Sequence, residues 1–430
     1  MNERLDKTSR AALARPFLIG CVLLLSMTAA WGQNANTSHW VNVWSTAVQT
    51  PRPMGASAAA PVVFDNQTIR MVIRTTLGGQ QLRVRLSNEF GATPLVIGSA
   101  HVALVQKNGS IVPGSDRILT FAGAGSTQIP AGAPLLSDPV KLGFQRFQEL
   151  AISIYLPGHQ PASTYHQLGQ HDTYISGPGD FTSSAELENP TTVTAWYFLA
   201  SVETDAPSST GAVVAFGDSI TDGFGAKHPY GDWPNLLADR LALEKGRPGL
   251  AVDNEGIGGN RILHDGAGVD ALARFDRDVL SQPAVKDLIV LEAINDIGWP
   301  NMKPRKGPDG AVRENPWAKE RVDAKAIIAG LEQIIGRAHE HGIRVFGATM
   351  TPYEGSDAFT SDGETIRETV NQWIRTGGAF DGVIDFDAAV RDPSSPSKFR
   401  EDMQTGDHLH PSAAGYKAMA AVIDLSKLHW

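Results

Sequence analysis

The spacing of apolar residues changes near residue 205, and this change limits the fold more than any other feature of the sequence. Between about residues 40 and 205 apolar and polar side chains alternate, as where Leu82 and Val84 flank Arg83. Beyond residue 211, short apolar runs alternate with patterns of helical spacing. Alternation of period two predicts strands that bury one face, whereas strand–helix alternation predicts a parallel sheet with helices on both faces.

The first region is expected to be an all-β domain. Clusters of Gly and Pro such as GATP, PGSD and PAGAP separate its strands at short intervals, and no helical pattern of useful length lies between them. An antiparallel sandwich, jelly-roll-like in its packing, is the natural arrangement for such strands. We therefore predict a β-sandwich accessory domain over residues 33–205.

The second region is expected to be an α/β domain over residues 211–430, after the polar linker ETDAPSSTG at 203–211. Helical spacing covers Trp233 to Leu241 and Val322 to Ile335. The expected strands are LAVDN and the runs 212–216, 287–291, 343–348 and 382–386. In such sheets ligands bind beyond the carboxyl ends of the strands.

Length and charge narrow the class of protein. A chain of 430 residues exceeds what one hydrophobic core usually supports, which favours two domains. The formal net charge is -9, which argues against binding to nucleic acid or to an anionic membrane surface. No H-E-x-x-H or comparable ligand cluster occurs, so we expect neither a metal nor another cofactor. The sequence says nothing about oligomeric state.

Residues 1–32 have the pattern of a cleavable export signal, with basic residues before the apolar run PFLIGCVLLLSMTAA and small residues at Ala30 and Gly32. We expect a mature chain from Gln33, secreted or periplasmic, without stable membrane association. One alternative is an uncleaved membrane anchor, although the apolar run is short for spanning a bilayer. Another is a lipoprotein modified at Cys21, but most of the apolar run follows Cys21, so a cut there would leave almost no hydrophobic region before it. After cleavage the chain would hold no cysteine and no disulfide.

Two motifs predict a nucleophile and its base. Ser219, in Gly-Asp-Ser, follows an apolar strand, and a serine hydroxyl needs an adjacent base in order to attack a carbonyl. His410, in DHLHP, precedes a helical pattern that we expect to begin at Pro411. Asp407 lies three residues earlier and can orient the imidazole. His408 competes for the role of base, although its adjacency to Asp407 makes that geometry awkward.

Two further motifs predict hydrogen-bond donors for an oxyanion. The block Asn254 to Asn260, with three glycines, follows the expected strand LAVDN, and glycine lets a backbone N–H approach a substrate closely. Asn295 closes the strand at 287–291 and offers a carboxamide N–H. Asp296 is expected to hold the loop. The glycine block alone is equally consistent with an ordinary turn.

The four blocks in this order resemble the GDSL family of lipases and acylhydrolases, and more narrowly the SGNH hydrolases, over residues 211–428. The resemblance implies a flavodoxin-like three-layer fold. It implies that Ser219 is the nucleophile, with its N–H in the oxyanion hole, and that His410 and Asp407 complete a triad. It also implies that Gly259 N–H and the Asn295 side chain are oxyanion donors. The chain departs from the family at Ala293, where glycine is usual. The resemblance therefore does not fix the reaction rate or the size of the acyl group that the pocket accepts.

The predicted activity is that of a serine esterase acting on short O-acyl esters, including acetyl groups on polysaccharides. One alternative is a lipase or lysophospholipase, although the 300–318 insertion, a surface loop or a lid, is polar. Another is a non-catalytic glycan-binding protein on a hydrolase fold. Trp233 and Trp299 are weak candidates for substrate-binding walls. The sandwich could bind substrate or serve only as a structural partner.

Overall fold

The computed structural model describes residues 39–51, 62–169, 171–226, 229–247, 249–307 and 310–430. These residues belong to one compact unit, Ser38–Trp430. The expected export signal, its cleavage site and Cys21 lie outside the described residues, so secretion stays a prediction. Within the described ranges, no helix combines the length and apolar character that crossing a membrane requires.

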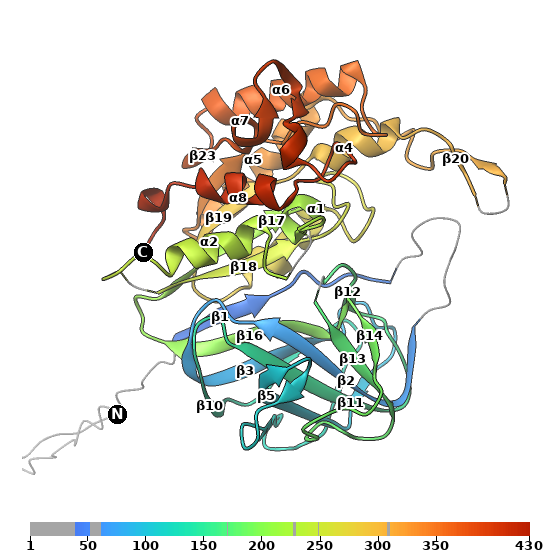
Figure 1. Cartoon of the computed structure of the whole chain (residues 1–430), viewed down its shortest axis with the longest axis vertical. Helices are drawn as coiled ribbons and strands as arrows, with labels where there is room; N and C mark the ends of the chain where they lie inside the picture. The colour runs from blue at the N-terminus through green and yellow to red at the C-terminus, as the bar shows by residue number, and fades with distance from the viewer. Residues whose placement is uncertain (1–38, 52–61, 170, 227–228, 248, 308–309) are drawn as a thin grey trace, which may run out of the picture. The chain divides into compact units, whose positions relative to one another are not determined.

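The first half of the chain forms two antiparallel sheets (Figure 1). The first sheet has the order β1(His39–Ser45), β16(Leu199–Ala206), β3(Gly79–Ser87), β10(Val140–Phe144), with β9(Pro134–Leu136) also paired to β3. The second has the order β14(Thr191–Val193), β13(Thr173–Pro178), β2(Val63–Arg74), β11(Glu149–Pro161), β5(Ser99–Lys107), β6(Ser110–Ile111), with β7(Arg117–Ile118) paired to β5. This half also contains two separate two-stranded sheets. They are β12(Tyr165–His166) with β15(Trp196–Tyr197) and β4(Leu95–Ile97) with β8(Thr127–Ile129).

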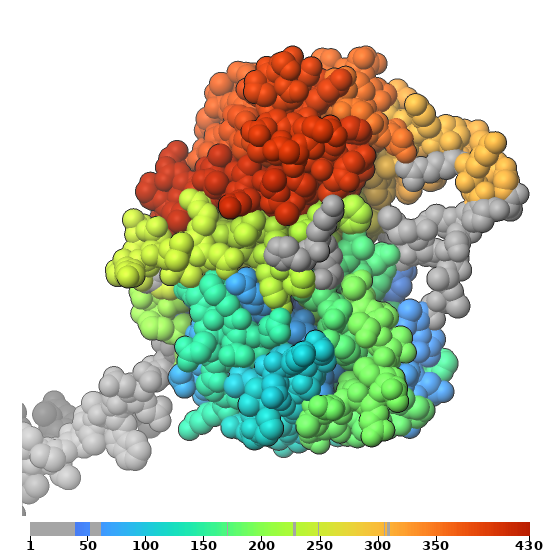
Figure 2. All heavy atoms as spheres, viewed as in Figure 1, coloured from blue at the N-terminus to red at the C-terminus, as the bar shows by residue number. Residues whose placement is uncertain are grey.

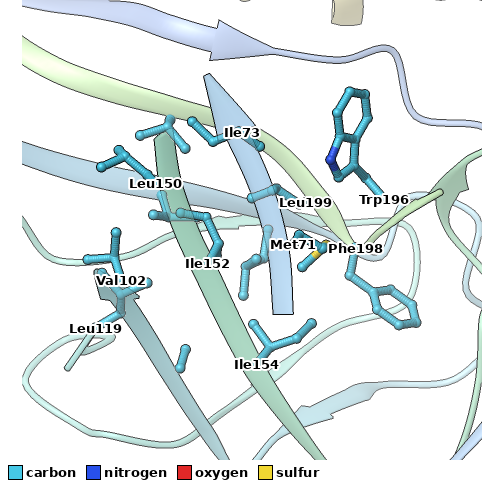
Figure 3. Close-up of a cluster of buried hydrophobic side chains, with 14 of the residues drawn as sticks. Met71, Ile73, Val102, Leu119, Leu150, Ile152, Ile154, Trp196, Phe198 and Leu199 are labelled. Carbon is cyan, nitrogen blue, oxygen red and sulfur yellow. The ribbon is translucent and has the colours of Figure 1, made fainter. Parts of the chain in front are cut away.

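Residues of both antiparallel sheets contribute to one buried cluster, part of which Figure 3 draws. On β2, every second residue from Ile69 to Ile73 points into it, and Ile152 of β11 lies opposite Met71 in the register. Leu199 joins them from the other sheet (Figure 3). The period-two pattern of the sequence therefore marks the buried face correctly. The jelly-roll-like connection of the strands stays a prediction.

The second half contains a parallel five-stranded sheet, as expected. Its order is β18(Leu250–Gly256), β17(Gly211–Gly217), β19(Val285–Leu291), β22(Arg344–Ala348), β23(Gly382–Ile384). In chain order this is 2-1-3-4-5, the strand order of flavodoxin-type sheets. The chain switches direction across the sheet between β17 and β19, which is where such sheets bind ligands.

Helices cover both faces of the parallel sheet (Figure 1). Val213 and Ala215 of β17 pack into one core with α2 and α8, while Val214 and Phe216 pack into another with α3 and α5. The α-helices are α1(Ser219–Asp222), α2(Trp233–Leu241), α3(Ala271–Phe275), α4(Ile294–Gly298), α5(Ala324–Glu340), α6(Ser361–Thr376), α7(Phe386–Val390) and α8(Ala413–Ala421). Short elements are η1(Asp276–Leu280), η2(Trp299–Asn301), η3(Glu401–Met403), η4(Leu425–Lys427), and the pairs β20(Arg305–Lys306) with β21(Val312–Arg313) and β24(Arg391–Asp392) with β25(Ser395–Phe399).

Several expected boundaries are wrong by a few residues, and three of them have a clear cause. Strand β16 continues to Ala206, because it pairs with β1 as far as Ala206 opposite His39, so the linker is shorter than 203–211. Strand β23 ends at Ile384, where Asp385 caps α7. Helix α8 begins after Pro411, because the Ser412 side chain accepts a hydrogen bond from Gly415 N–H and acts as the cap.

The two halves pack together along β1 and β18. Asn42 Nδ2 donates to Asp253 Oδ2 at 3.2 Å, and the Ser45 hydroxyl donates to Glu255. On the face drawn in Figure 2, atoms of the two halves meet along much of their boundary. Because β18 leads directly into the glycine block, this boundary lies close to the predicted site.

Candidate active site

Ser219 lies at the carboxyl edge of the parallel sheet, directly after β17. The chain turns there because the Asp218 side chain caps the short helix α1, accepting a hydrogen bond from Ile220 N–H at 2.9 Å. Burial raises the pKa of this Asp218 carboxyl. Ser219 is only 8% exposed, but its N–H belongs to the first turn of a helix, where no acceptor lies within the helix. No acceptor for that N–H is found among the described residues, so it can donate to a ligand.

The structure brings the predicted base to the serine. Ser219 Oγ lies 2.8 Å from His410 Nε2, and His410 Nδ1 lies 2.6 Å from Asp407 Oδ2. Because a carboxylate only accepts, Nδ1 carries the hydrogen and Nε2 is left to accept from the serine hydroxyl. This is the arrangement in which an imidazole can remove the proton of a nucleophilic serine.

The Asp407 carboxylate is held by the turn that contains it. Its Oδ1 accepts from the N–H groups of Leu409 at 3.0 Å and His410 at 2.9 Å, and from the Thr405 hydroxyl at 3.0 Å. Burial acts to raise the pKa of Asp407, but the hydrogen bonds from His410 and Leu409 outweigh it and hold that pKa below its usual range. His408, the competing candidate, adopts φ 58°, and its backbone N–H donates to Gln404 Oε1 at 3.2 Å. Among the described residues, the side chains of Ser219 and Asp407 bond to His410 instead. The left-handed backbone of His408 closes the turn.

Gly259 lies in the loop after β18, with φ 80°. A Cβ at this position would stand 2.6 Å from Cζ2 of Trp299, so both the backbone conformation and the space require glycine. Its N–H has no acceptor among the described residues. Gly259 N–H is thus a second donor available at this edge of the sheet.

Asn295 lies in the first turn of α4, after β19. Its Nδ2 donates one hydrogen to Asn260 O at 3.0 Å, which fixes the carboxamide against the glycine loop and leaves the other hydrogen. Ala293, just before it, has φ 96° and caps α4 in the left-handed region. The structure thus explains why glycine is usual there: an alanine in this conformation costs about 1 kcal/mol or more.

Arg274 is a buried residue behind the site that sequence reasoning missed. Its guanidinium donates to Gly217 O at 3.0 Å, to Glu255 O at 2.8 Å and to Asn260 Oδ1 at 2.8 Å. It thereby ties the end of β17, the end of β18 and the glycine loop together. In sequence it belongs to an ordinary helical charge pair with Asp278, four residues on, so no signal marks it.

Asp296 holds the loop that follows the glycine block, as the sequence predicted. Its carboxylate accepts from Ile262 N–H at 2.7 Å and Leu263 N–H at 3.0 Å. Burial raises the pKa of Asp296 to about 6. The side chain faces the loop backbone, so its contribution is to position the loop.

The two tryptophan candidates have different outcomes. Trp233 is fully buried and packs against Phe386, so the prediction that it forms a substrate-binding wall is wrong. Trp299 is 5% exposed and lies under Gly259, where it supports the loop and offers little open surface. The ring of Trp317, from the 300–318 insertion, packs against it at 4.5 Å between centroids.

Phe224 is an aromatic residue of the site that the sequence analysis did not single out. Its ring lies 4.4 Å from the His410 ring and is 40% exposed, which makes it an apolar surface beside the base. Its carbonyl accepts from Tyr416 of α8 at 2.8 Å. An aromatic residue within a glycine-rich turn after the nucleophile was the only sequence signal for it.

Comparisons with known proteins identify a family domain in the second half of the chain. No curated protein matches the chain. Among solved structures, a GDSL-like lipase from Bacteroides thetaiotaomicron is similar at 17% identity and a TM-score of 0.35, covering 50% of this chain and 87% of that one. An acetylxylan esterase from Geobacillus stearothermophilus is similar at 21% identity and a TM-score of 0.36, covering 49% and 91%. The sequence model of the GDSL-like Lipase/Acylhydrolase family matches residues 215–418, and the chain therefore carries a domain of that family.

Proposed function

We propose that the protein is a serine esterase that hydrolyses O-acyl esters in two steps. His410 Nε2 accepts the proton of Ser219 as its Oγ attacks the acyl carbon, and Asp407 stabilises the resulting imidazolium. The carbonyl oxygen gains the negative charge and receives hydrogen bonds from Gly259 N–H, Ser219 N–H and the Asn295 side chain. Collapse of this intermediate breaks the ester C–O bond, and His410 gives its proton to the leaving alcohol.

Water completes the reaction. His410, neutral again, removes a proton from a water molecule that attacks the acyl-enzyme, and the same donors stabilise the second oxyanion. When the bond to Ser219 breaks, the proton returns to its Oγ and the free acid leaves. The observation that carries this proposal is the aligned contact of 2.8 Å from Ser219 to His410 and 2.6 Å from His410 to Asp407.

Replacement of the serine tests the proposal. Ser219→Ala should lower kcat for p-nitrophenyl acetate by about 10⁴-fold or more, because the nucleophile is removed while the fold is kept. Circular dichroism and thermal unfolding should match those of the parent protein. Turnover by the alanine variant within about tenfold of the parent rate would contradict the assignment of Ser219.

We further propose that the acyl group is short and that polysaccharide acetyl esters are among the substrates. The insertion that would have to act as a lipid-binding lid is rich in Pro, Gly and charged residues. Among its described residues, Val312 is the one large apolar side chain that is exposed. Phe224 is the one large exposed apolar residue that we find beside the base, within the described residues. Rates should fall from acetyl to palmitoyl p-nitrophenyl esters, and acetylated xylan or pectin should release acetate. A maximum at long chains would favour the lipase alternative.

A further inference from the structure

His166 belongs to the antiparallel half of the molecule, yet it contacts the helix that carries the predicted nucleophile. It lies in β12, where its side chain is 2% exposed. Its Nε2 lies 3.1 Å from Asp222 Oδ1, at the end of α1, and its Nδ1 lies 2.8 Å from the carbonyl oxygen of Ala47. Both contacts are fixed, because the ring also packs against Trp196 at 5.6 Å between centroids.

Asp222 connects His166 to the glycine loop. Its second oxygen, Oδ2, accepts from Gly258 N–H at 3.1 Å. Gly258 immediately precedes Gly259, so the hydrogen bond fixes one peptide unit of the chain that presents the proposed oxyanion donor. Leu168, two residues beyond His166, also reaches this loop, since a Cβ on Gly258 would stand 2.6 Å from its Cδ1.

The partners of His166 determine its protonation. A backbone carbonyl and a carboxylate both accept and do not donate, so the two contacts are satisfied together only when both ring nitrogens carry a hydrogen. Burial acts to lower the pKa of His166, but the charge and hydrogen bond of Asp222 outweigh it, and the pKa is raised. The two acceptors and the raised pKa both favour the imidazolium form of His166, paired with Asp222 inside the protein.

We propose that His166 and Asp222 are positioning residues that aim Gly259 N–H at the oxyanion, so that the antiparallel half completes the catalytic apparatus. The sandwich is then more than a structural partner. This inference rests on the proposed esterase activity, and it assigns no chemical step to His166. Its effect is confined to the orientation of the glycine loop.

Three variants separate positioning from general stability. His166→Leu removes the donor and should lower kcat for p-nitrophenyl acetate by about tenfold to a hundredfold with little change in KM, less than the loss of a whole oxyanion donor. His166→Gln keeps an N–H for Asp222 and should recover most of that loss. Tyr230→Phe is the matched control, since it removes another hydrogen bond between the halves, to Glu149 at 2.6 Å, away from the glycine loop. It should keep the parent kcat.

A double-variant cycle tests whether His166 acts through Asp222. Asp222→Ala should lower kcat at least as much as His166→Leu, and the variant with both changes should be no worse than Asp222→Ala alone. Losses that multiply would show two independent effects and would overturn the proposed path. Equal losses in His166→Leu and Tyr230→Phe would overturn it as well.

The pH profile gives a readout that a purely structural role would not change. The groups that surround His166 are Asp222 and the buried guanidinium of Arg274, and the cavity that it lines also holds Arg74, His171 and Asp232. As pH rises and His166 loses its proton, the parent kcat should fall, whereas His166→Gln should lack this alkaline limb. Identical profiles would contradict the proposal.

Amide hydrogen exchange measures the loop without reference to activity. In His166→Leu, peptides covering residues 254–262 should exchange faster than in the parent and in Tyr230→Phe, because Gly258 N–H is no longer held by a fixed carboxylate. Unchanged exchange there would overturn the inference. If the parent protein hydrolyses no ester while the exchange difference is found, the proposed function fails and the positioning contact stands.

Discussion

The two sides of the site are held in different ways. On the base side, one turn of six residues, from Thr405 to His410, supplies the imidazole, its carboxylate and the hydrogen bonds that fix both. On the oxyanion side, the glycine loop is held by residues far from it in sequence, among them Arg274, Trp299 and the pair of His166 with Asp222. A local motif thus builds one side, and tertiary packing builds the other.

The difference predicts how variants will behave. A change on the base side should affect the reaction without affecting the fold, because its contacts are local and partly exposed. A change on the oxyanion side should affect both, because each contact also joins separate segments of the chain. Measurements of kcat and of the free energy of unfolding on the same variants test this contrast.

The largest expected effect is on the base side. Asp407→Ala should lower kcat by about 10³- to 10⁴-fold, because His410 loses the group that fixes its tautomer and stabilises its charge. The free energy of unfolding should fall by only about 1 kcal/mol, as for the loss of a turn-capping side chain. Denaturant titration beside ester kinetics checks both. A large loss of stability would show that this turn supports more than itself.

Asn295→Ala should have the next largest effect. Loss of an oxyanion donor should lower kcat by about 10²- to 10³-fold with little change in KM. The lost hydrogen bond to Asn260 O is buried, so the free energy of unfolding should also fall by about 1 to 3 kcal/mol. Unchanged stability beside a large kinetic loss would break the contrast between the two sides.

Asp253, on β18 just before the glycine loop, predicts a pH dependence of stability. Burial raises its pKa to about 7 in the folded protein, against about 3.9 in an unfolded chain. The folded state therefore prefers the protonated acid, so the contribution of Asp253 to stability is greatest below about pH 4 and falls as pH rises toward 7. One such group changes the free energy of unfolding by at most about 1.4 kcal/mol for each pH unit.

Asp253→Asn removes this titrating group while it keeps the size of the side chain. The variant should lose less stability than the parent between pH 4 and pH 7, as followed by denaturant titration at several pH values. Buried Glu255, whose pKa burial also raises, leaves part of the slope in place. Parallel curves for parent and variant would mean that Asp253 does not titrate in this range.

The smallest effect is expected from Ala293→Gly. Glycine relieves the left-handed backbone at φ 96°, but it increases the freedom of the unfolded chain and removes a buried methyl group. These contributions oppose each other, so the free energy of unfolding should stay within about 1 kcal/mol of the parent value. Ala293→Val places a β-branched side chain in the same conformation and should destabilise by clearly more. Equal stability of the two variants would show that the backbone there relaxes.

The same contrast explains what the sequence could predict. Alternation of period two and then of strand and helix predicted the antiparallel half and the parallel sheet, and the family domain is confirmed. The turn around Asp407 and His410 was readable because three residues of spacing suffice to bring the two side chains together. Trp233 was misread because an aromatic residue at helical spacing looks alike in a core and on a binding wall.

The supports of the glycine loop could not be read in this way. The contact of His166 with Asp222 joins residues 56 positions apart, and no pattern within either segment indicates it. Arg274 looks like an exposed helical charge and is in fact buried. The cause is physical: such contacts depend on how separate elements pack in three dimensions, which local periodicity does not encode.

Strand β18 stands at the end of the parallel sheet, and one of its outward N–H groups, that of Val252, donates to the hydroxyl of Thr76 in the antiparallel half. An exposed edge strand offers unpaired N–H and C=O groups with which a strand of another chain can pair. The docked half thus shields this edge, so a fragment cut near residue 208 should self-associate through β18 when it is expressed alone.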